Sequence, residues 1–102
     1  MSVNMNKTIE PLTLKTADIF KILSDPTRLK IIQTLQEAEL CVNDIALHTS
    51  FSQSTVSHHL KTLREANLVG LRRSGKRSFY RLADSHVSAL LAVARDHARE
   101  SI

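Results

Sequence analysis

Two short helical segments joined by a three-residue break constrain the fold of this chain more than any other feature. The first, NDIALHT (43–49), has helical spacing with Asn43 near its cap, and SFS then interrupts it. Ser52 stands where a helix N-cap is favoured, just before the second segment, 53–66. Apolar residues of that segment recur on one helical face: Val56, Leu60 and Leu63. Two helices joined in this way predict a helix-turn-helix whose second member is the recognition helix.

A predicted β-hairpin follows directly, in LVGLRRSGKRSFYRL (68–82). Its two β-prone runs flank Ser74-Gly75, a dipeptide typical of tight turns. We expect the apolar residues of the second run to pack the hairpin on the core rather than to stack on bases: Phe79, Tyr80 and Leu82. A helix-turn-helix followed by such a hairpin is a winged helix, so the predicted fold class is mainly α with a β-hairpin wing.

Three further helical segments surround this unit. Apolar residues recur with helical spacing over 12–23, and Ser24 or Asp25 can cap a second helix whose first turn contains Pro26. The third segment is 85–99. We expect a flexible N-terminal arm at 1–11 and one DNA-binding and dimerisation domain at 12–102, since 102 residues favour a single domain.

Composition narrows the class of protein. No apolar run approaches the ~20 residues that span a membrane, so no membrane partner is expected. A single cysteine, Cys41, excludes an internal disulfide and fits a cytoplasmic protein in a reducing compartment. The net charge of +4 and the pI of about 9.6 favour a polyanionic partner.

The predicted DNA interface combines polar residues of the recognition helix with cations of the wing. The helix residues can hydrogen-bond to bases or phosphates: Gln53, Ser54, Ser57, His58 and Lys61. The wing residues form a cationic ribbon suited to a phosphate backbone: Arg72, Arg73, Lys76 and Arg77. The alternative is that both sets are merely solvated surface. The helix-turn-helix pattern directly upstream favours double-stranded DNA as the partner.

The last helix contains two pairs of metal-ligand residue types. Asp84 and His86 lie at its start, and His97 and Glu100 lie at its end. His86 and His97 share one face but are separated by about 16 Å along the axis, so one chain cannot offer both to one ion. The alternative is a capping aspartate, a solvated glutamate and two surface histidines.

An antiparallel second copy of this helix would resolve the separation. The midpoints of the two candidate pairs, His86 with His97 and Asp84 with Glu100, both fall near residue 92, so one two-fold axis serves both. The predicted homodimer, formed through the first and last helices, would contain two identical sites of two nitrogens and two carboxylates. That donor set suits tetrahedral zinc.

The chain resembles the ArsR/SmtB family of metal-sensing winged-helix repressors over roughly residues 14–100. The resemblance is carried by LSDPTRLKIIQTL (23–35), ELCVNDIA (39–46), SQSTVSHHLKTL (52–63), the wing and the closing D-x-H-x10-H-x2-E. It implies that the last pattern binds Zn²⁺ across the dimer, with Co²⁺ as a substitute. It also implies that the metal-free dimer binds an inverted-repeat operator and releases it on zinc binding, which derepresses metal efflux or sequestration genes.

Departures from the family's other patterns leave one alternative open. Some relatives have a second metal site around ELCVC; here Asn43 replaces the second cysteine, while Cys41 and Asp44 are retained. One cysteine cannot form the intrachain pair of persulfide-sensing relatives. The alternative is a regulator of the same fold that senses redox through Cys41 or binds no metal. A zinc hydrolase is not expected, because four protein ligands leave no open coordination position.

Overall fold

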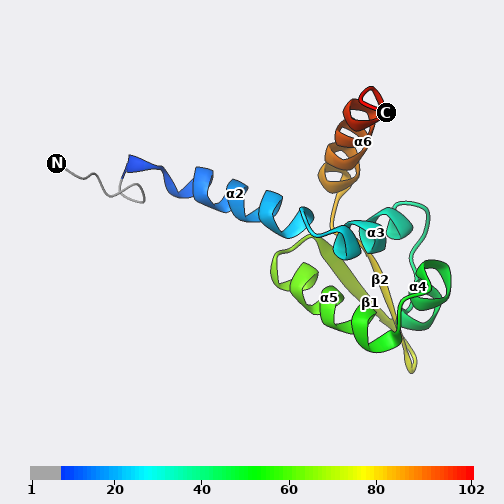
Figure 1. The fold of residues 1–102 in the computed structure, drawn as a ribbon. Helices are drawn as coiled ribbons and strands as arrows, with labels where there is room; N and C mark the ends of the chain where they lie inside the picture. Colours follow the sequence, from blue (N-terminus) through cyan, green and yellow to red (C-terminus); the bar gives the residue numbers. More distant parts are fainter. Residues whose placement is uncertain (1–7) are drawn as a thin grey trace.

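The computed structural model describes residues 8–102 and shows a winged helix-turn-helix, as the sequence predicts (Figure 1). Its elements follow in this order: α2 (Pro11–Leu23), α3 (Pro26–Leu35), α4 (Val42–Thr49), α5 (Gln53–Glu65), β1 (Val69–Ser74), β2 (Arg77–Leu82) and α6 (Ser85–Arg99). Helix α2 already begins at Pro11, inside the range expected for an N-terminal arm. Residues 1–7 of that arm lie outside the described residues.

Side-chain caps start the central helices. Asp25 and Ser52 each accept a hydrogen bond from the backbone N–H three residues later, at 2.9 and 3.1 Å. Asp25, rather than Ser24, therefore caps α3. Asn43 lies near the cap of α4, as expected: the N-cap itself is Cys41, which has an extended backbone and whose carbonyl accepts the N–H of Ile45. Asn43 consequently lies within the first turn of α4.

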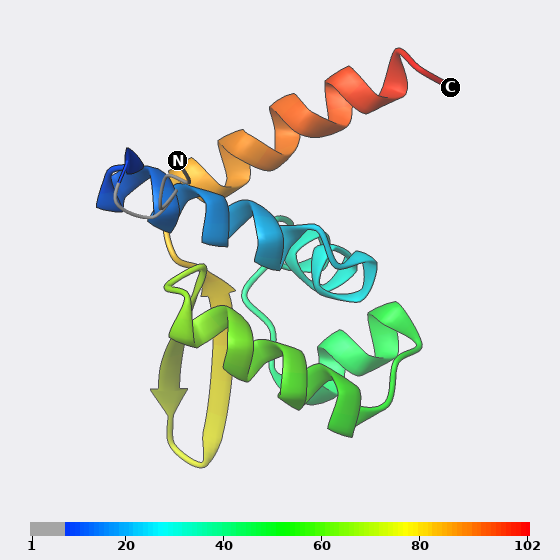
Figure 2. The same cartoon turned by 60° about the vertical axis from the view of Figure 1, so that its left-hand side comes forward.

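The core lies between α3, α4, α5 and the start of β1 (Figure 2). Its most deeply buried side chains come from the three helices: Ile31, Ile32, Ile45, Val56, Leu60 and Leu63. The predicted stripe of the recognition helix is thus confirmed, and burying such side chains is worth roughly 1.5–3 kcal/mol each. The buried stripe leaves the opposite face of α5 exposed.

The wing is a two-stranded antiparallel hairpin with Val69 opposite Leu82 and Ser74 opposite Arg77. The turn is therefore Gly75-Lys76, one residue later than predicted, because Ser74 still pairs in β1. Gly75 has a φ of 61°, and a glycine at the first central position suits a type II′ hairpin turn. The tip of the wing is consequently tight and holds its cations close together.

A backbone pairing not expected from the sequence attaches the wing to the helical core. Leu40, in the connector between α3 and α4, exchanges two hydrogen bonds with Tyr80 of β2, at 3.0 and 2.8 Å. Tyr80 and Leu82 pack against the core as predicted. The expectation for Phe79 was wrong: neighbouring side chains of a strand point to opposite faces, and the Phe79 ring lies beneath wing arginines instead.

Helices α2 and α6 extend from this body (Figures 1 and 2). Helix α2 buries only Leu23, and α6 buries only Val87 and Leu91. Both also present large apolar side chains to solvent, including Phe20 and Val93, which are 54% and 69% exposed. Within residues 8–102, no helix is long and apolar enough to cross a membrane.

Candidate DNA interface and metal half-sites

The recognition helix α5 presents all five predicted DNA-binding residues on its exposed side. They are Gln53, Ser54, Ser57, His58 and Lys61. The buried stripe on the other side holds this surface in place, and the cap by Ser52 fixes the start of the helix. A helix N-terminus with free backbone N–H groups and short polar side chains can accept a phosphate and reach base edges.

One of these residues is already hydrogen-bonded across the helix-turn-helix. The Nε2 of Gln53 donates to the Oδ1 of Asn43 at 2.7 Å, which joins the start of α5 to the first turn of α4. From the sequence, Asn43 was expected only to lie near the cap of α4. No sequence pattern indicates this contact, because it depends on how the two helices are placed relative to each other.

The four predicted cations of the wing are all exposed, but they differ in their surroundings. The Nε of Arg72 donates to the Oε1 of Glu39 at 2.6 Å, and its guanidinium lies 4.9 Å from the centre of the Phe79 ring. Arg77 lies over the same ring at 5.9 Å. Arg73 and Lys76 have no ion pair or hydrogen bond with any side chain that the structure describes. These two are the cations most available to a phosphate.

Behind the recognition helix, His59 approaches the start of α3. The Nδ1 of His59 is buried and has no hydrogen-bond partner within residues 8–102. Burial of the ring lowers the pKa of His59, although the Asp25 carboxylate opposes this effect. The hydrogen bond from the Arg28 backbone N–H lowers the pKa of Asp25. His59 is therefore a neutral packing residue of α5 at neutral pH.

The predicted metal ligands form two separate pairs on α6. His86 Nδ1 lies 3.6 Å from Asp84 Oδ1, and His97 Nδ1 lies 4.0 Å from Glu100 Oε2. No cluster of three or more metal-ligand residue types occurs in the part of the chain that the structure describes. Donor atoms around a tetrahedral zinc are separated by roughly 3.3 Å, given bonds of about 2.0–2.1 Å. Both separations are longer than this, so neither pair is already arranged around an ion in the single chain. The two pairs, Asp84 with His86 and His97 with Glu100, are called the half-sites below.

Asp84 is also the N-cap of α6. Its Oδ1 accepts the backbone N–H groups of His86 and Val87 at 2.9 and 3.2 Å. Neither of these bonds uses Oδ2. The predicted capping role is confirmed, and it leaves one carboxylate oxygen for another partner.

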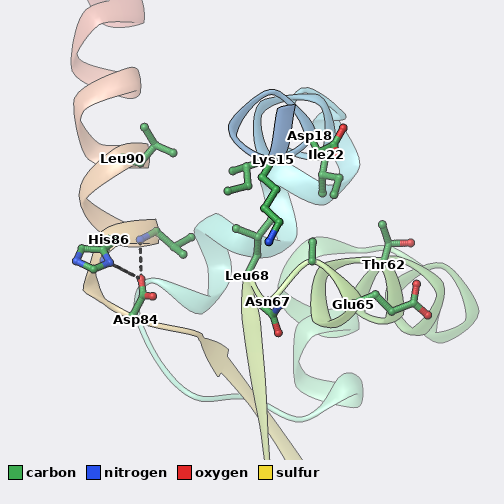
Figure 3. Close-up of a pocket in the computed structure, with 13 residues that line it drawn as sticks. Lys15, Asp18, Ile22, Thr62, Glu65, Asn67, Leu68, Asp84, His86 and Leu90 are labelled. Atoms are coloured by element: carbon green, nitrogen blue, oxygen red, sulfur yellow. Dashed lines mark hydrogen bonds and ion pairs between the residues drawn. The ribbon is translucent and has the colours of Figure 1, made fainter. Parts of the chain in front are cut away.

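A hollow of about 700 Å³ lies beside the first half-site (Figure 3). It is bounded by α2, the end of α5 and the start of α6, and Asp84, His86 and Asn67 are among its polar residues. Ile19, Ile22 and Leu90 contribute apolar surface. Asn67 has a φ of 60° and ends the recognition helix, so the hollow adjoins both the half-site and the DNA-facing element.

Cys41 is partly buried at the start of α4, and its Sγ donates to Asp44 Oδ2 at 3.3 Å. Among the described residues it is the one cysteine and makes no disulfide. This placement fits a structural thiol better than a redox sensor, which needs an exposed and activated thiolate.

Comparison with known proteins matches this geometry to a family. A family model for bacterial regulatory proteins of the arsR family matches residues 25–70, which include the helix-turn-helix. The chain is 43% identical over 88 residues to a cadmium resistance transcriptional regulatory protein, a CadC homolog of Staphylococcus aureus. The aligned region covers 85% of this chain and 73% of that relative. The chain belongs to the ArsR/SmtB family of transcriptional regulators.

Other members give the same result. A transcriptional repressor SmtB homolog of Synechocystis is 45% identical over 85 residues, which are 83% of this chain and 64% of that relative. The solution structure of a homodimeric winged helix-turn-helix DNA-binding domain from Mycobacterium bovis has a TM-score of 0.83 at 31% identity, and covers 98% of this chain and 90% of that one. These relatives of the ArsR/SmtB family are DNA-binding regulators, not enzymes. The matched region of the family model ends at Gly70, before both half-sites.

Proposed function

We propose that this member of the family is a zinc-responsive repressor. Its metal-free homodimer binds an inverted-repeat operator, and zinc bound between two antiparallel copies of α6 lowers the affinity for DNA and derepresses metal efflux or sequestration genes. The observation that carries the proposal is the pair of half-sites at opposite ends of α6, each with one imidazole and one carboxylate.

A second copy is the occupant that suits the exposed faces of α2 and α6. Large apolar side chains on these helices are solvent-exposed in the single chain, and the hollow between them is partly apolar. The relative from Mycobacterium bovis is homodimeric, which supports a dimer for this chain. In an antiparallel pair of α6 helices centred near Ala92, the His97 and Glu100 of each copy reach the Asp84 and His86 of the other. The symmetry generates two sites per dimer.

The donor set favours zinc. Zinc, when bound, supplies charge and a tetrahedral coordination shell that hold two imidazoles and two carboxylates together. The side chains of His86 and His97 are 92% and 86% exposed, so both rings can turn toward a partner helix. Asp84 can cap with Oδ1 and bind with Oδ2, so its two roles do not compete. Co²⁺ is the expected substitute.

The coupling to DNA follows from the shared dimer core. If the two copies of α6 are held in one arrangement, the recognition helices attached to the same core are held at one separation. A separation that fits the operator poorly lowers DNA affinity, and linkage requires DNA to weaken zinc binding by the same factor. The resemblance suggests that the second ring N–H of His97 donates to a backbone carbonyl near Asn67. In the dimer that acceptor would lie in the hollow of the other copy.

The test is a zinc titration of the protein and of its DNA complex, with an operator duplex selected from a random-sequence library. Wild-type protein should bind two zinc ions per dimer and should release the duplex as they bind. The His86→Asn/His97→Asn double variant should bind the duplex normally, take up neither ion and show no release. Normal zinc stoichiometry in the double variant would refute the proposed site. An unchanged affinity for the duplex while two zinc ions are bound per dimer would refute the mechanism.

The alternative, redox sensing through Cys41, is not favoured. The relatives include a cadmium resistance transcriptional regulatory protein and an SmtB homolog, and Cys41 is a partly buried thiol that donates to Asp44. A Cys41→Ser variant should therefore keep full zinc-dependent release.

A further inference from the structure

The hydrogen bond between Asn43 and Gln53 joins the two helices of the motif on the outside of the molecule. Asn43 is the second residue of α4 and Gln53 is the first residue of α5. Both side chains are exposed, and their 2.7 Å contact is short for an amide pair. Exposed side chains ordinarily gain little by bonding to each other rather than to water, so a fixed orientation is the main consequence of this contact.

The backbones beneath this pair are already fixed by other contacts. Ile45 and Val56, each fully buried, hold the first turns of α4 and α5 against the core. The break between the helices is fixed by Ser50, whose φ is 65°, and by the Ser52 cap. The hydrogen bond between Asn43 and Gln53 therefore adds little to the stability of the fold. It selects one rotamer of Gln53 out of those that a long exposed side chain would sample.

The selected rotamer has a defined hydrogen-bonding capacity. A glutamine amide has one oxygen acceptor and two N–H donors, and Asn43 takes one of the donors. The oxygen and the second N–H have no partner among the described residues, and they lie side by side when Asn43 takes the N–H that points away from the oxygen. That pair is what a glutamine presents to the N6 and N7 edge of adenine in the major groove.

We infer that Asn43 is a positioning residue for base recognition: it does not contact DNA itself but holds Gln53 ready for one adenine in each operator half-site. The inference rests on the proposed DNA-binding role of α5 and adds to it a residue from the other helix of the motif. Its consequence is a narrower base preference at one position, with little change in total affinity.

The experiment is a selection of binding sites from a random duplex library with the full, metal-free chain. Wild type should select an inverted repeat with a preferred adenine in each half-site, and a bidentate contact of this kind gives roughly five- to 150-fold discrimination. Gln53→Ala should abolish the preference at that position. Asn43→Ala should reduce it at least about threefold at the same position and leave the other positions unchanged. The double variant should resemble Gln53→Ala alone.

Two control variants separate positioning from a structural role. Asn43→Asp retains an acceptor for Gln53, so it should retain the base preference even if its charge lowers the affinity for all sequences. Gln36→Ala removes another partly exposed amide, which bonds to Ser88 far from α5, and should change no preference.

The outcomes are distinct. If Asn43→Ala selects the same sites as wild type, or loses affinity uniformly for all sites, the inference is overturned. It is also overturned if Gln53→Ala alters no position, although the proposed repressor function then stands. Wild-type protein that selects no sequence at all would overturn both the inference and the proposed repressor function.

Discussion

The DNA-facing surface and the metal half-sites differ in what holds them. The recognition helix is anchored by three buried side chains, Val56, Leu60 and Leu63, and one chain presents the whole surface. Helix α6 buries two side chains near its start, and everything after Leu91 is exposed. Its two half-sites lie at opposite ends of the helix and need a second chain to complete them. One chain therefore builds its proposed DNA interface alone, whereas the proposed sensor needs two chains.

The largest expected effect comes from charge at the centre of the proposed α6 pair. Val93 is 69% exposed and lies near the inferred two-fold axis, so Val93→Glu would place two like charges close together. Such a juxtaposition costs several kcal/mol, and the dimer dissociation constant should rise about a hundredfold or more. Sedimentation against concentration measures this constant.

Leu47→Glu is the matched control for that change. Leu47 is 74% exposed but lies on α4, away from α6. The Leu47→Glu variant should remain as dimeric as wild type. If Val93→Glu is as dimeric as wild type, the proposed pairing of two α6 helices, and with it a metal site shared between two chains, is contradicted.

The next largest effect separates operator binding from the response to zinc within one dimer. His97→Asn should keep operator affinity and lose the zinc-dependent decrease, because the ring is half of a proposed site. Allosteric couplings are typically five- to 150-fold, and the ratio of affinities without and with zinc should fall to about one. Asp96→Asn, a neighbouring carboxylate that pairs with Arg99, should keep the wild-type ratio. Normal release by His97→Asn would exclude this ligand.

A smaller effect distinguishes the cations within the wing. Arg73→Gln and Lys76→Gln should each weaken binding to all sequences alike and reduce the slope of log affinity against log salt by about 0.9. Arg72→Gln should change that slope less, because Glu39 already pairs with Arg72 at 2.6 Å. Binding isotherms at several salt concentrations give the slopes. A loss confined to one operator position would show that the residue reads a base instead.

The smallest effect concerns pH and the packing of the recognition helix. The unfolded chain takes up the His59 proton near pH 6.5, but the folded chain does so only at lower pH because burial lowers the pKa. The free energy of unfolding should therefore fall as the pH drops below about 6.5 through the folded pKa. The lowered pKa of Asp25 adds a further loss below pH 3.8.

Urea midpoints at pH 7.5 and 5.5 measure the His59 contribution. The difference between them should be smaller in His59→Gln than in wild type. An equal difference in wild type and His59→Gln would argue against neutral packing of His59.

The elements of the fold were predictable where one periodic pattern or one capping residue decides the structure. The buried stripe of α5 and the caps by Ser52 and Asp84 depend on local spacing, so the sequence indicates them directly. The Leu40–Tyr80 pairing was not predictable, because it joins residues distant in sequence through backbone atoms common to every residue type. The Phe79 error has a different, local source, since neighbouring residues of a strand face opposite ways and Phe79 could not share the core-facing side of Tyr80 and Leu82.

The candidate sites follow the same division. Residue spacing on α6 is enough to exclude a one-chain site and to suggest a shared one. Spacing says nothing about which exposed side chains pair with each other. The Glu39–Arg72 ion pair and the Asn43–Gln53 bond therefore appear only when the connector, the wing and the two helix starts are placed in space.

Because α6 is sparsely anchored and needs a second copy, zinc binding by the proposed sensor should depend on the concentration of the protein. A site that requires two chains obeys mass action in the chain as well as in the metal, so its apparent zinc affinity should weaken once the protein falls below its dimer dissociation constant. A cell that makes only a few copies of such a repressor would then set its metal threshold partly by how much of the repressor it makes.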